Sequence, residues 1–214
     1  MILYGSTISP YVRKVMAFLA EKGVEAELKP GGMGSGGPAF LAASPFGKMP
    51  AMADGDFTLC DSSAIIAYIE AKHPEPNLIP AEPQARGRTT WFDEFADTIF
   101  TTVGSKMFFN RFVAPKVLKR EGDEAVAAAA QRDELPPLLA YLEGQIPASG
   151  FLVEDRLTLA DLAVASPFAN LRHVEVLVDA ATYPKTVAYI DAILARPSFA
   201  TLIAAEQRLI ATLG

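Results

Sequence analysis

Residues 2–15 constrain the fold most, because they predict a strand, a tight loop and a helix in immediate succession. Residues 2–4 form a short apolar run, which Gly5 ends. Ser9 is a preferred helix cap and Pro10 is tolerated at the first helical position, so a helix begins here. Its apolar face carries Val12, Val15, Met16 and Leu19. We therefore expect the functional site at the N-terminus of this helix.

The composition narrows the kind of partner. A chain of 214 residues suits two domains that share an interface. Its formal net charge of -6 argues against nucleic acid or an anionic membrane surface, so a small soluble ligand is the expected partner. A single cysteine, Cys60, excludes an internal disulfide framework and a multi-cysteine metal site. The absence of a basic leader and of a long apolar run predicts a soluble, cytoplasmic protein.

A second strand and a glycine-rich loop follow the first helix. Gly23 is a helix stop, and residues 24–29 are predicted to form a strand, which gives a strand, helix, strand crossover. Residues 30–38 contain five glycines and are predicted to be a mobile surface loop.

This loop imitates a dinucleotide-binding fingerprint. Gly32, Gly34 and Gly37 have the right spacing, and Asp54 lies at a suitable distance beyond them. The fingerprint requires a long helix after its last glycine, whereas residues 38–43 are too few and no alternation of strands and helices follows. We therefore expect neither a nicotinamide nor a flavin cofactor.

A hairpin and a polar helix entry complete the first half. Residues 50–53 and 57–60 are short apolar runs around Asp54-Gly55, a dipeptide suited to a two-residue turn. Pro50 has no N–H to donate, so it belongs at the first position or the edge of its strand. Asp61, Ser62 and Ser63 lead into a helix over residues 64–72. They are suited to capping, and equally to binding an anion or polar ligand.

A proline-rich linker separates this half from a helical one. Residues 73–83 contain four prolines and no hydrophobic period, so the predicted domains are 1–79 and 84–214. Helices are predicted over 86–112, 124–143, 183–195 and 198–213, with a break at Pro136-Pro137. Thr158 and Asp161 form a capping box that opens another helix. The apolar stripe of the first of these helices carries Trp91, Phe92, Phe95, Ile99 and Val103.

Four motifs in this order resemble the cytosolic glutathione S-transferases over nearly the whole chain. Residues 9–15 resemble the first-helix motif of serine-type classes of the bacterial, tau or theta kind. Residues 44–50, Ser-Pro-Phe-Gly-Lys-Met-Pro, resemble the segment that ends in the family's cis-proline. Asp61-Ser62 resembles its Glu-Ser or Asp-Ser pair, and residues 157–161 resemble its buried capping box.

The resemblance implies a fold and a cosubstrate. It implies an α/β thioredoxin-like N-terminal domain, an all-helical C-terminal domain and, usually, a homodimer. Glutathione would bind mainly to the first domain, and a hydrophobic electrophile would lie against the second.

Ser9 is the residue that the resemblance makes catalytic. Its hydroxyl would stabilise the glutathione thiolate, while its oxygen could also accept from the N–H of Tyr11 or Val12 and cap the helix. A purely structural cap is the alternative role. Ser6, Thr7 and Tyr4 are nearby hydroxyls, any of which could be the thiol donor instead.

The remaining site residues follow from the same resemblance. Asp61 would pair with the α-amino group of the γ-glutamyl end, and Ser62 would receive its α-carboxylate. The backbone of Met49, held by Pro50, would pair with the cysteinyl unit, and Lys48 could meet the glycyl carboxylate. The electrophile pocket is assigned to Tyr11, Met107, Phe108, Phe109 and Phe112, although core packing is the commoner fate of such aromatics.

Other polar residues receive no role. Arg13 and Lys14 are expected to be surface or interdomain charges. His73 and His173 have no partner spacing that suggests a metal or acid–base catalysis.

The predicted function is a glutathione transferase. An ether-cleaving lyase, a dehalogenase or an isomerase on the same scaffold is the nearest alternative. A non-catalytic glutathione-binding or regulatory protein is the alternative from another class. The presence together of Ser9, Met49-Pro50 and Asp61-Ser62 argues against it.

Overall fold

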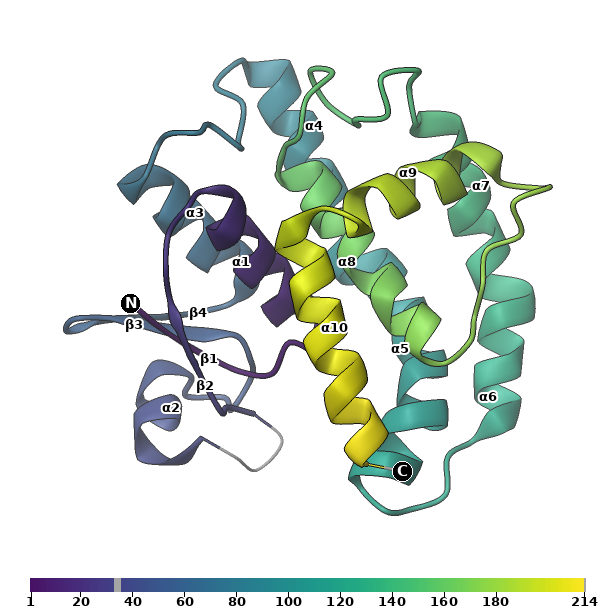
Figure 1. Ribbon diagram of the computed structural model, residues 1–214, viewed down its shortest axis with the longest axis horizontal. Coiled ribbons are helices and arrows are strands. Elements are labelled where there is room, and N and C mark those ends of the chain that lie inside the picture. Colours follow the sequence, from purple (N-terminus) through teal and green to yellow (C-terminus); the bar gives the residue numbers. More distant parts are fainter. Residues whose placement is uncertain (33–35, 214) are drawn as a thin grey trace. The chain divides into compact units, whose positions relative to one another are not determined.

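The computed structural model describes residues 1–32 and 36–213, which form two compact units, Met1–Ile79 and Pro80–Gly214 (Figure 1). The first unit contains a four-stranded mixed sheet with helices, and the described part of the second is built on helices. The predicted fold class is therefore confirmed. Gly34, a member of the imitated fingerprint, lies outside the described residues.

The sheet of the first unit has the strand order β2-β1-β3-β4. The strands are β1 (Ile2–Tyr4), β2 (Glu27–Lys29), β3 (Ala51–Asp54) and β4 (Phe57–Cys60). β1 and β2 are parallel and are joined through helix α1 (Pro10–Glu21), whereas β1 with β3 and β3 with β4 are antiparallel. This arrangement makes β1 an interior strand, paired on both sides.

Three helices cover this sheet. α1 packs against α3 (Ser62–Lys72), and α2 (Gly37–Ala43) contacts β3 and β4. Successive side chains of a strand point to opposite faces, so Leu3 and Tyr4 enter different layers. Tyr4 lies in a buried cluster with Phe40, and their ring centroids are 6.2 Å apart. The sheet thus has an apolar layer on each face.

Two sequence predictions in this unit were wrong by small shifts. The strand predicted over residues 24–29 covers only Glu27–Lys29, because the N–H of Val24 donates to Leu19 at the end of α1. The hairpin turn is Gly55-Asp56 and not Asp54-Gly55. Asp54 stays in the ladder opposite Phe57.

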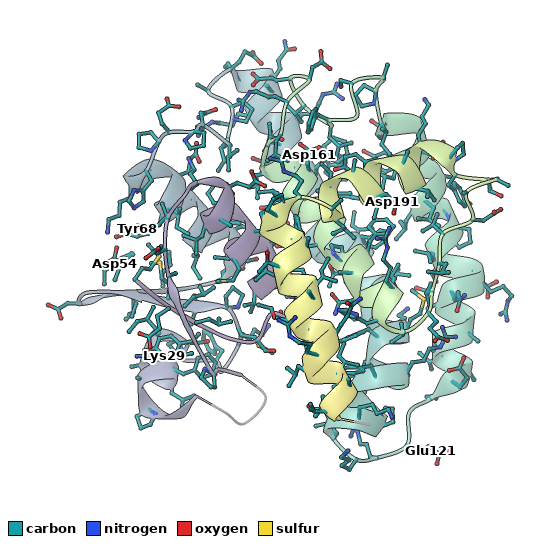
Figure 2. All side chains as sticks on the ribbon, in the orientation of Figure 1. Lys29, Asp54, Tyr68, Glu121, Asp161 and Asp191 are labelled. Carbon is teal, nitrogen blue, oxygen red and sulfur yellow. The ribbon has the colours of Figure 1, made fainter. Side chains whose placement is uncertain are left out.

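The carboxylate of Asp54 also belongs to the packed part of the unit. It accepts a hydrogen bond from the Tyr68 hydroxyl at 2.7 Å and forms an ion pair with Lys72. Figure 2 labels Asp54 and Tyr68 near each other. These contacts tie the hairpin to α3. They explain why the turn begins one residue later, at Gly55, whose φ of 60° suits glycine.

A buried lysine holds the end of the first unit together. The Lys22 side chain is 0% exposed, forms an ion pair with Glu70, and donates to the carbonyls of His73 and Pro76, each at 2.7 Å. The other carboxylate oxygen of Glu70 accepts from Asn77, Leu78 and Ile79. Backbone and side-chain hydrogen bonds therefore fix the proline-rich segment after α3, in addition to the burial of Leu78.

The second unit contains ten helical segments among the described residues. They are α4 (Pro83–Glu94), η1 (Phe95–Phe100), α5 (Thr101–Phe108), η2 (Phe109–Val117), α6 (Glu124–Ala129), η3 (Ala130–Glu134), α7 (Leu135–Gln145), α8 (Leu159–His173), α9 (Pro184–Leu194) and α10 (Pro197–Thr212). Pro136 and Pro137 lie in the first turn of α7, where proline is tolerated. The predicted break was wrong, because helical structure continues from α6 through the π-helical segment η3 into α7.

The predicted stripe of the first long helix is only partly buried. Phe92, Phe95 and Val103 are buried, whereas Trp91 and Ile99 are 45% and 38% exposed. Trp91 turns outward to donate its indole N–H to the hydroxyl of Tyr141 at 2.6 Å. Ile99 lies in the π-helical segment η1, whose wider turn breaks the 3.6-residue period behind the prediction.

No single helix of the described residues is both long and apolar enough to cross a membrane. α9 and α10, which meet at a bend of 85°, meet the length and composition criteria only as a pair.

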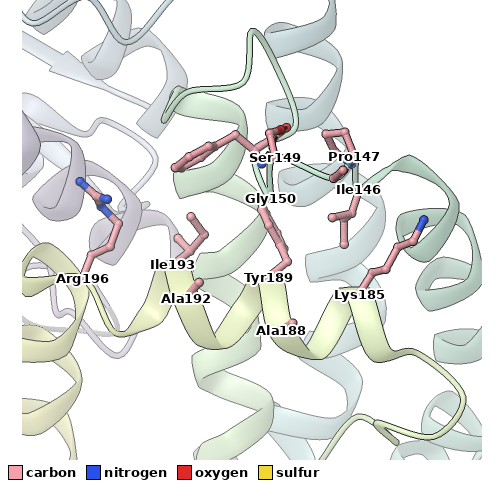
Figure 3. A pocket seen from close by; sticks show the side chains of 12 residues that line it. Ile146, Pro147, Ser149, Gly150, Lys185, Ala188, Tyr189, Ala192, Ile193 and Arg196 are labelled. Carbon is pink, nitrogen blue, oxygen red and sulfur yellow. Dashed lines mark hydrogen bonds between the residues drawn. The ribbon is translucent and has the colours of Figure 1, made fainter.

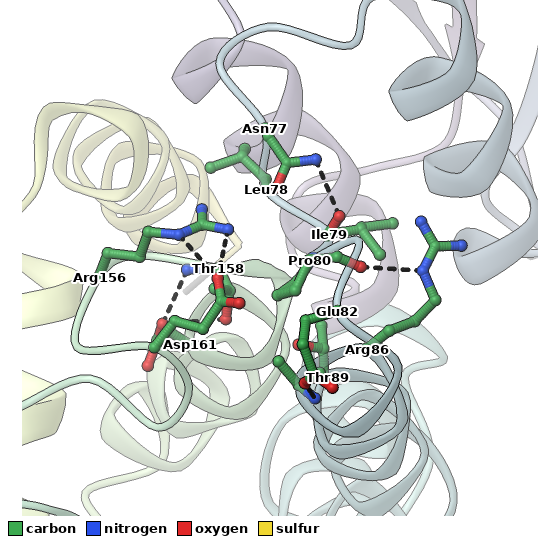
Figure 4. A network of polar contacts seen from close by, with 12 residues as sticks. Asn77, Leu78, Ile79, Pro80, Glu82, Arg86, Thr89, Arg156, Thr158 and Asp161 are labelled. Atoms are coloured by element: carbon green, nitrogen blue, oxygen red, sulfur yellow. Dashed lines mark hydrogen bonds and ion pairs between the residues drawn. The ribbon is translucent and has the colours of Figure 1, made fainter.

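The capping box at the start of α8 is confirmed and is buried. One oxygen of Asp161 accepts from the N–H of Thr158 at 2.9 Å, and the other accepts from the N–H of Leu152 and the hydroxyl of Tyr189. Figure 4 shows Asp161 beside Thr158. The same view shows Pro80, whose carbonyl accepts a hydrogen bond from the side chain of Arg86. Burial raises the pKa of Asp161 to about 6, although these hydrogen bonds oppose the rise.

The raised pKa of Asp161 predicts a pH dependence of stability. Because the folded state holds this proton more tightly than the unfolded chain, with its ordinary pKa of 3.8, stability decreases as pH rises through about 6. The loss amounts to about 3 kcal/mol, since one pKa unit corresponds to about 1.4 kcal/mol. In urea unfolding, the free energy of unfolding of the wild type relative to that of Asp161→Asn should decrease between about pH 4 and pH 7, because the other carboxyl groups contribute equally to both proteins. Parallel profiles would contradict the assignment.

Candidate active site

The register of the sheet brings three separate segments to one edge. Tyr4 is paired with Ala51, and Ala51 is paired with Cys60. Beyond this line β1 continues into Gly5, β3 is preceded by Pro50, and β4 continues into Asp61. Neighbouring strands are about 4.8 Å apart, so the three exits span roughly 10 Å. The predicted segments that contain Ser9, Met49-Pro50 and Asp61-Ser62 therefore start from one end of the sheet.

Gly5 allows the start of α1 to pack closely on this edge. A Cβ atom at Gly5 would lie 2.5 Å from a methyl group of Val12 and 3.5 Å from Cβ of Met49. Its φ of 155° also favours glycine. Its N–H donates to the carbonyl of Lys29 at 2.9 Å, which ties the loop to β2. The first turn of α1 and Met49 are thus neighbours across a residue without a side chain.

Ser9 occupies the N-cap position of α1 but does not cap it with its side chain. Its backbone is extended, and its carbonyl accepts from the N–H of Arg13 at 2.9 Å. The hydroxyl makes no capping hydrogen bond to the described backbone, so the expectation that it accepts from Tyr11 or Val12 was wrong. Pro10 already presets the helical φ at the first position. The half-exposed hydroxyl therefore has capacity for a ligand.

The alternative donors lie in different surroundings. Tyr4 is 6% exposed, and its ring packs against Phe40 of α2 rather than along α1. Ser6 and Thr7 are half-buried residues of the loop that precedes Ser9. Of these hydroxyls, only that of Ser9 belongs to the N-cap residue of α1.

Met49 and Pro50 lie where β3 enters the sheet. The peptide bond between them is cis, as the family resemblance implied. Met49 is half-buried, and its sulfur lies 3.0 Å from the place that a Cβ at Gly32 would occupy. Lys48 is exposed, and its carbonyl accepts from the hydroxyl of Ser44 at 2.7 Å. The segment is fixed through its backbone, while the Lys48 ammonium remains in solvent.

Asp61 caps α3 as its sequence context suggested, and its role in binding a ligand stays a prediction. Its carboxylate caps α3 by accepting from the N–H groups of Ser63 and Ala64, each at 3.0 Å, and the residue is exposed. Its φ of 83° is unusual for a residue with a side chain, and such positions concentrate at functional sites. Ser62, the next residue, is 2% exposed. An exposed carboxylate thus stands beside a helix N-terminus.

The expectation for Arg13 and Lys14 was wrong in part. They are 0% and 1% exposed, so they are not surface charges, whereas the alternative of interdomain charges stays a prediction. The Lys14 ammonium lies 3.4 Å from the hydroxyl oxygen of Ser63 in the first turn of α3. The sequence does contain a signal for their burial. A crossover helix packs on both a sheet and another helix, so more than one of its faces is covered.

The residues proposed for the electrophile pocket differ in exposure. Met107, Phe108 and Phe112 are buried, and the rings of Phe108 and Phe112 stack with centroids 5.0 Å apart. Phe109 is 36% exposed, with the Arg120 guanidinium 5.2 Å from its ring centroid. Tyr11 of the first unit is half-buried. The assignment of these five residues to an electrophile pocket stays a prediction.

The second unit also has a cavity of about 390 Å³ beside α9 (Figure 3). Its walls come from the loop after α7 and from α9, with Lys185 and Arg196 at its two ends. The described residues that line it include none of the predicted site residues. Among residues 1–32 and 36–213, no group of three or more histidine, cysteine or acidic side chains could hold a metal ion.

Comparison with known families decides the identity. The pattern of the glutathione S-transferase N-terminal domain matches residues 3–77, and that of the C-terminal domain matches residues 102–197. The chain belongs to the glutathione S-transferase family. Glutathione S-transferase 3 of Zea mays is 32% identical to it over 95% of this chain and 93% of the relative.

Solved structures of glutathione S-transferases have the same fold. Glutathione S-transferase III in its apo form is 33% identical, with a TM-score of 0.81 and 95% of each chain covered. A glutathione S-transferase of Methylobacterium radiotolerans, in complex with glutathione sulfonate, is 27% identical, with a TM-score of 0.76 over 94% of this chain and 93% of that one. The serine-type, tau or theta assignment stays a prediction.

The close contact at Gly5 gives a test of how this edge is built. Gly5→Ala should lower the free energy of unfolding by more than about 2 kcal/mol, because the methyl group meets Val12 and the φ is strained. Gly23→Ala is the matched control, since Gly23 also has a positive φ but has nothing within 4 Å, and it should cost about 1 kcal/mol. Equal losses in denaturant unfolding would show that the Val12 contact is unimportant.

Proposed function

We propose that this transferase binds glutathione across the end of the sheet, with Ser9 stabilising the thiolate that attacks a hydrophobic electrophile. The observation that carries the proposal is the register of Tyr4, Ala51 and Cys60, which gathers the three predicted binding segments at one edge. The relative crystallised with glutathione sulfonate supports glutathione as the cosubstrate.

The edge offers a partner for each part of the peptide. The exposed Asp61 carboxylate pairs with the α-amino group, and Ser62 with the N-terminus of α3 receives the α-carboxylate. The backbone of Met49 lies just outside the ladder, before Pro50, and pairs with the cysteinyl unit. Lys48 is exposed and meets the glycyl carboxylate. Opposite charges thus meet at both ends of the ligand.

The chemistry requires a thiolate at neutral pH. A free thiol has a pKa of about 8.5, and lowering it by two units needs about 2.7 kcal/mol of preferential stabilisation of the anion. The Ser9 hydroxyl donates to sulfur, and the N-terminus of α1 adds a favourable partial charge. The thiol proton leaves to solvent. Sulfur then bonds to the electrophilic carbon, and either a leaving group departs with its electron pair or a double bond is saturated.

The electrophile is assigned to an apolar pocket of Tyr11, Met107, Phe108, Phe109 and Phe112. Phe109 is the member on η2 with an exposed ring, so it is the one in the second unit that a substrate can reach directly. An aromatic or alkyl electrophile suits such a lining better than a charged one.

We also propose that the enzyme is a cytoplasmic homodimer. Phe46 is 87% exposed in the loop between α2 and β3, where water would surround nearly its whole ring in a monomer. Burial of such a ring in a second copy of the chain supports association. The single cysteine suits a reducing compartment.

Light scattering during size-exclusion chromatography tests the dimer. The wild type should have the mass of two chains, and Phe46→Ser should shift the population toward one chain because it removes the apolar anchor. Phe57→Ser, at a position 46% exposed on β4, is the control and should not alter the mass. A monomeric wild type would contradict the proposal.

Substitution of Ser9 tests the catalytic assignment. Ser9→Ala should lower kcat for conjugation of a standard aryl halide by about 100-fold, while glutathione still raises the melting temperature. The physical reason is that the variant loses the donor to sulfur and keeps the contacts to the rest of the peptide. Ser6→Ala, Thr7→Ala and Tyr4→Phe are the controls.

The outcomes distinguish a wrong thiol donor from a wrong function. Equal rates for the wild type and Ser9→Ala would place the donor elsewhere, and a loss in one of the three controls would identify it. If glutathione neither binds nor shifts the melting temperature of the wild type, the proposed function fails.

A further inference from the structure

Lys14 is a buried cation next to the proposed site that has no part in the chemistry above. It lies on α1, five residues after Ser9, and is 1% exposed. Its ammonium is 3.4 Å from the hydroxyl oxygen of Ser63, which directly follows Asp61-Ser62. The side chain therefore connects the helix that begins at the thiol end to the helix that begins at the γ-glutamyl end.

Burial of an ammonium costs free energy of solvation that methionine, which has a similar length, would avoid. A lysine at this position instead places a charged hydrogen-bond donor against the first turn of α3.

We propose that Lys14 is a positioning residue, which ties α1 to α3 and so sets the separation between Ser9 and Asp61-Ser62. The inference rests on the proposed function. Glutathione is a ligand of limited length, and its sulfur meets Ser9 correctly only when its γ-glutamyl end is seated on α3. The sheet fixes the points at which the chain leaves β1 and β4. Lys14 then fixes the position of the N-terminus of α1 relative to that of α3.

Lys22 provides a matched control on the same helix system. It too is a buried lysine, with a side chain 0% exposed, and it too connects α1 to α3 through the ion pair with Glu70. Its contacts lie at the opposite end, where it binds the carbonyls of His73 and Pro76. Loss of Lys22 should therefore lower stability without changing the relation between Ser9 and Asp61.

The experiment compares two ligands by titration calorimetry: glutathione, and the analogue in which alanine replaces cysteine. The wild type should prefer glutathione because only its sulfur engages Ser9. Lys14→Met should reduce this preference by about tenfold, the usual effect of losing a charge-assisted hydrogen bond. It should also lower kcat for conjugation more than it raises KM. Lys14→Arg should restore the preference, and Lys22→Met should retain it despite a lower melting temperature.

A second variant keeps the test decisive if Lys14→Met does not fold. Ser63→Ala removes the acceptor with a minimal change in volume and should reduce the preference in the same direction. Unchanged preference in Lys14→Met or in Ser63→Ala would overturn the inference. Absence of any preference in the wild type, or its persistence in Ser9→Ala, would instead refute the proposed role of Ser9.

Discussion

The pairing of β1, β3 and β4 is the constraint on which the rest of the first unit depends. The line through Tyr4, Ala51 and Cys60 decides which residues leave the sheet together. A slip of one residue in either pairing would exchange the two faces of a strand and would bury polar side chains in an apolar layer. Hydrophobic burial therefore maintains the register, and the register in turn places Gly5, Pro50 and Asp61 side by side.

Close packing then brings the helices to this edge. Gly5 allows Val12 to approach the end of β1, and Pro10 starts α1 without the Ser9 side chain. At α3 the opposite solution is used, because the Asp61 carboxylate caps the helix itself. One helix thus leaves a hydroxyl for a ligand, while the other presents an exposed carboxylate at its first turn.

Buried charges are a recurring device in both units. Lys22 and Glu70 fix the proline-rich segment, and Asp161 organises the start of α8. Each is surrounded by backbone donors or acceptors, which compensate in part for its removal from water. Such groups select one arrangement of the loops, whereas apolar packing alone would allow several.

The sequence by itself determined the element types, the change to helices after the proline-rich segment, the capping box at Thr158 and the family, because propensity, capping and motif order are local properties. Only the tertiary structure decided that the Ser9 hydroxyl does not cap its helix, that Trp91 is exposed, and that Lys14 is buried beside Ser63. The physical reason is that burial and side-chain pairing depend on residues far apart in the chain. Helical periodicity identifies an apolar face, but it does not reveal what covers the remaining faces.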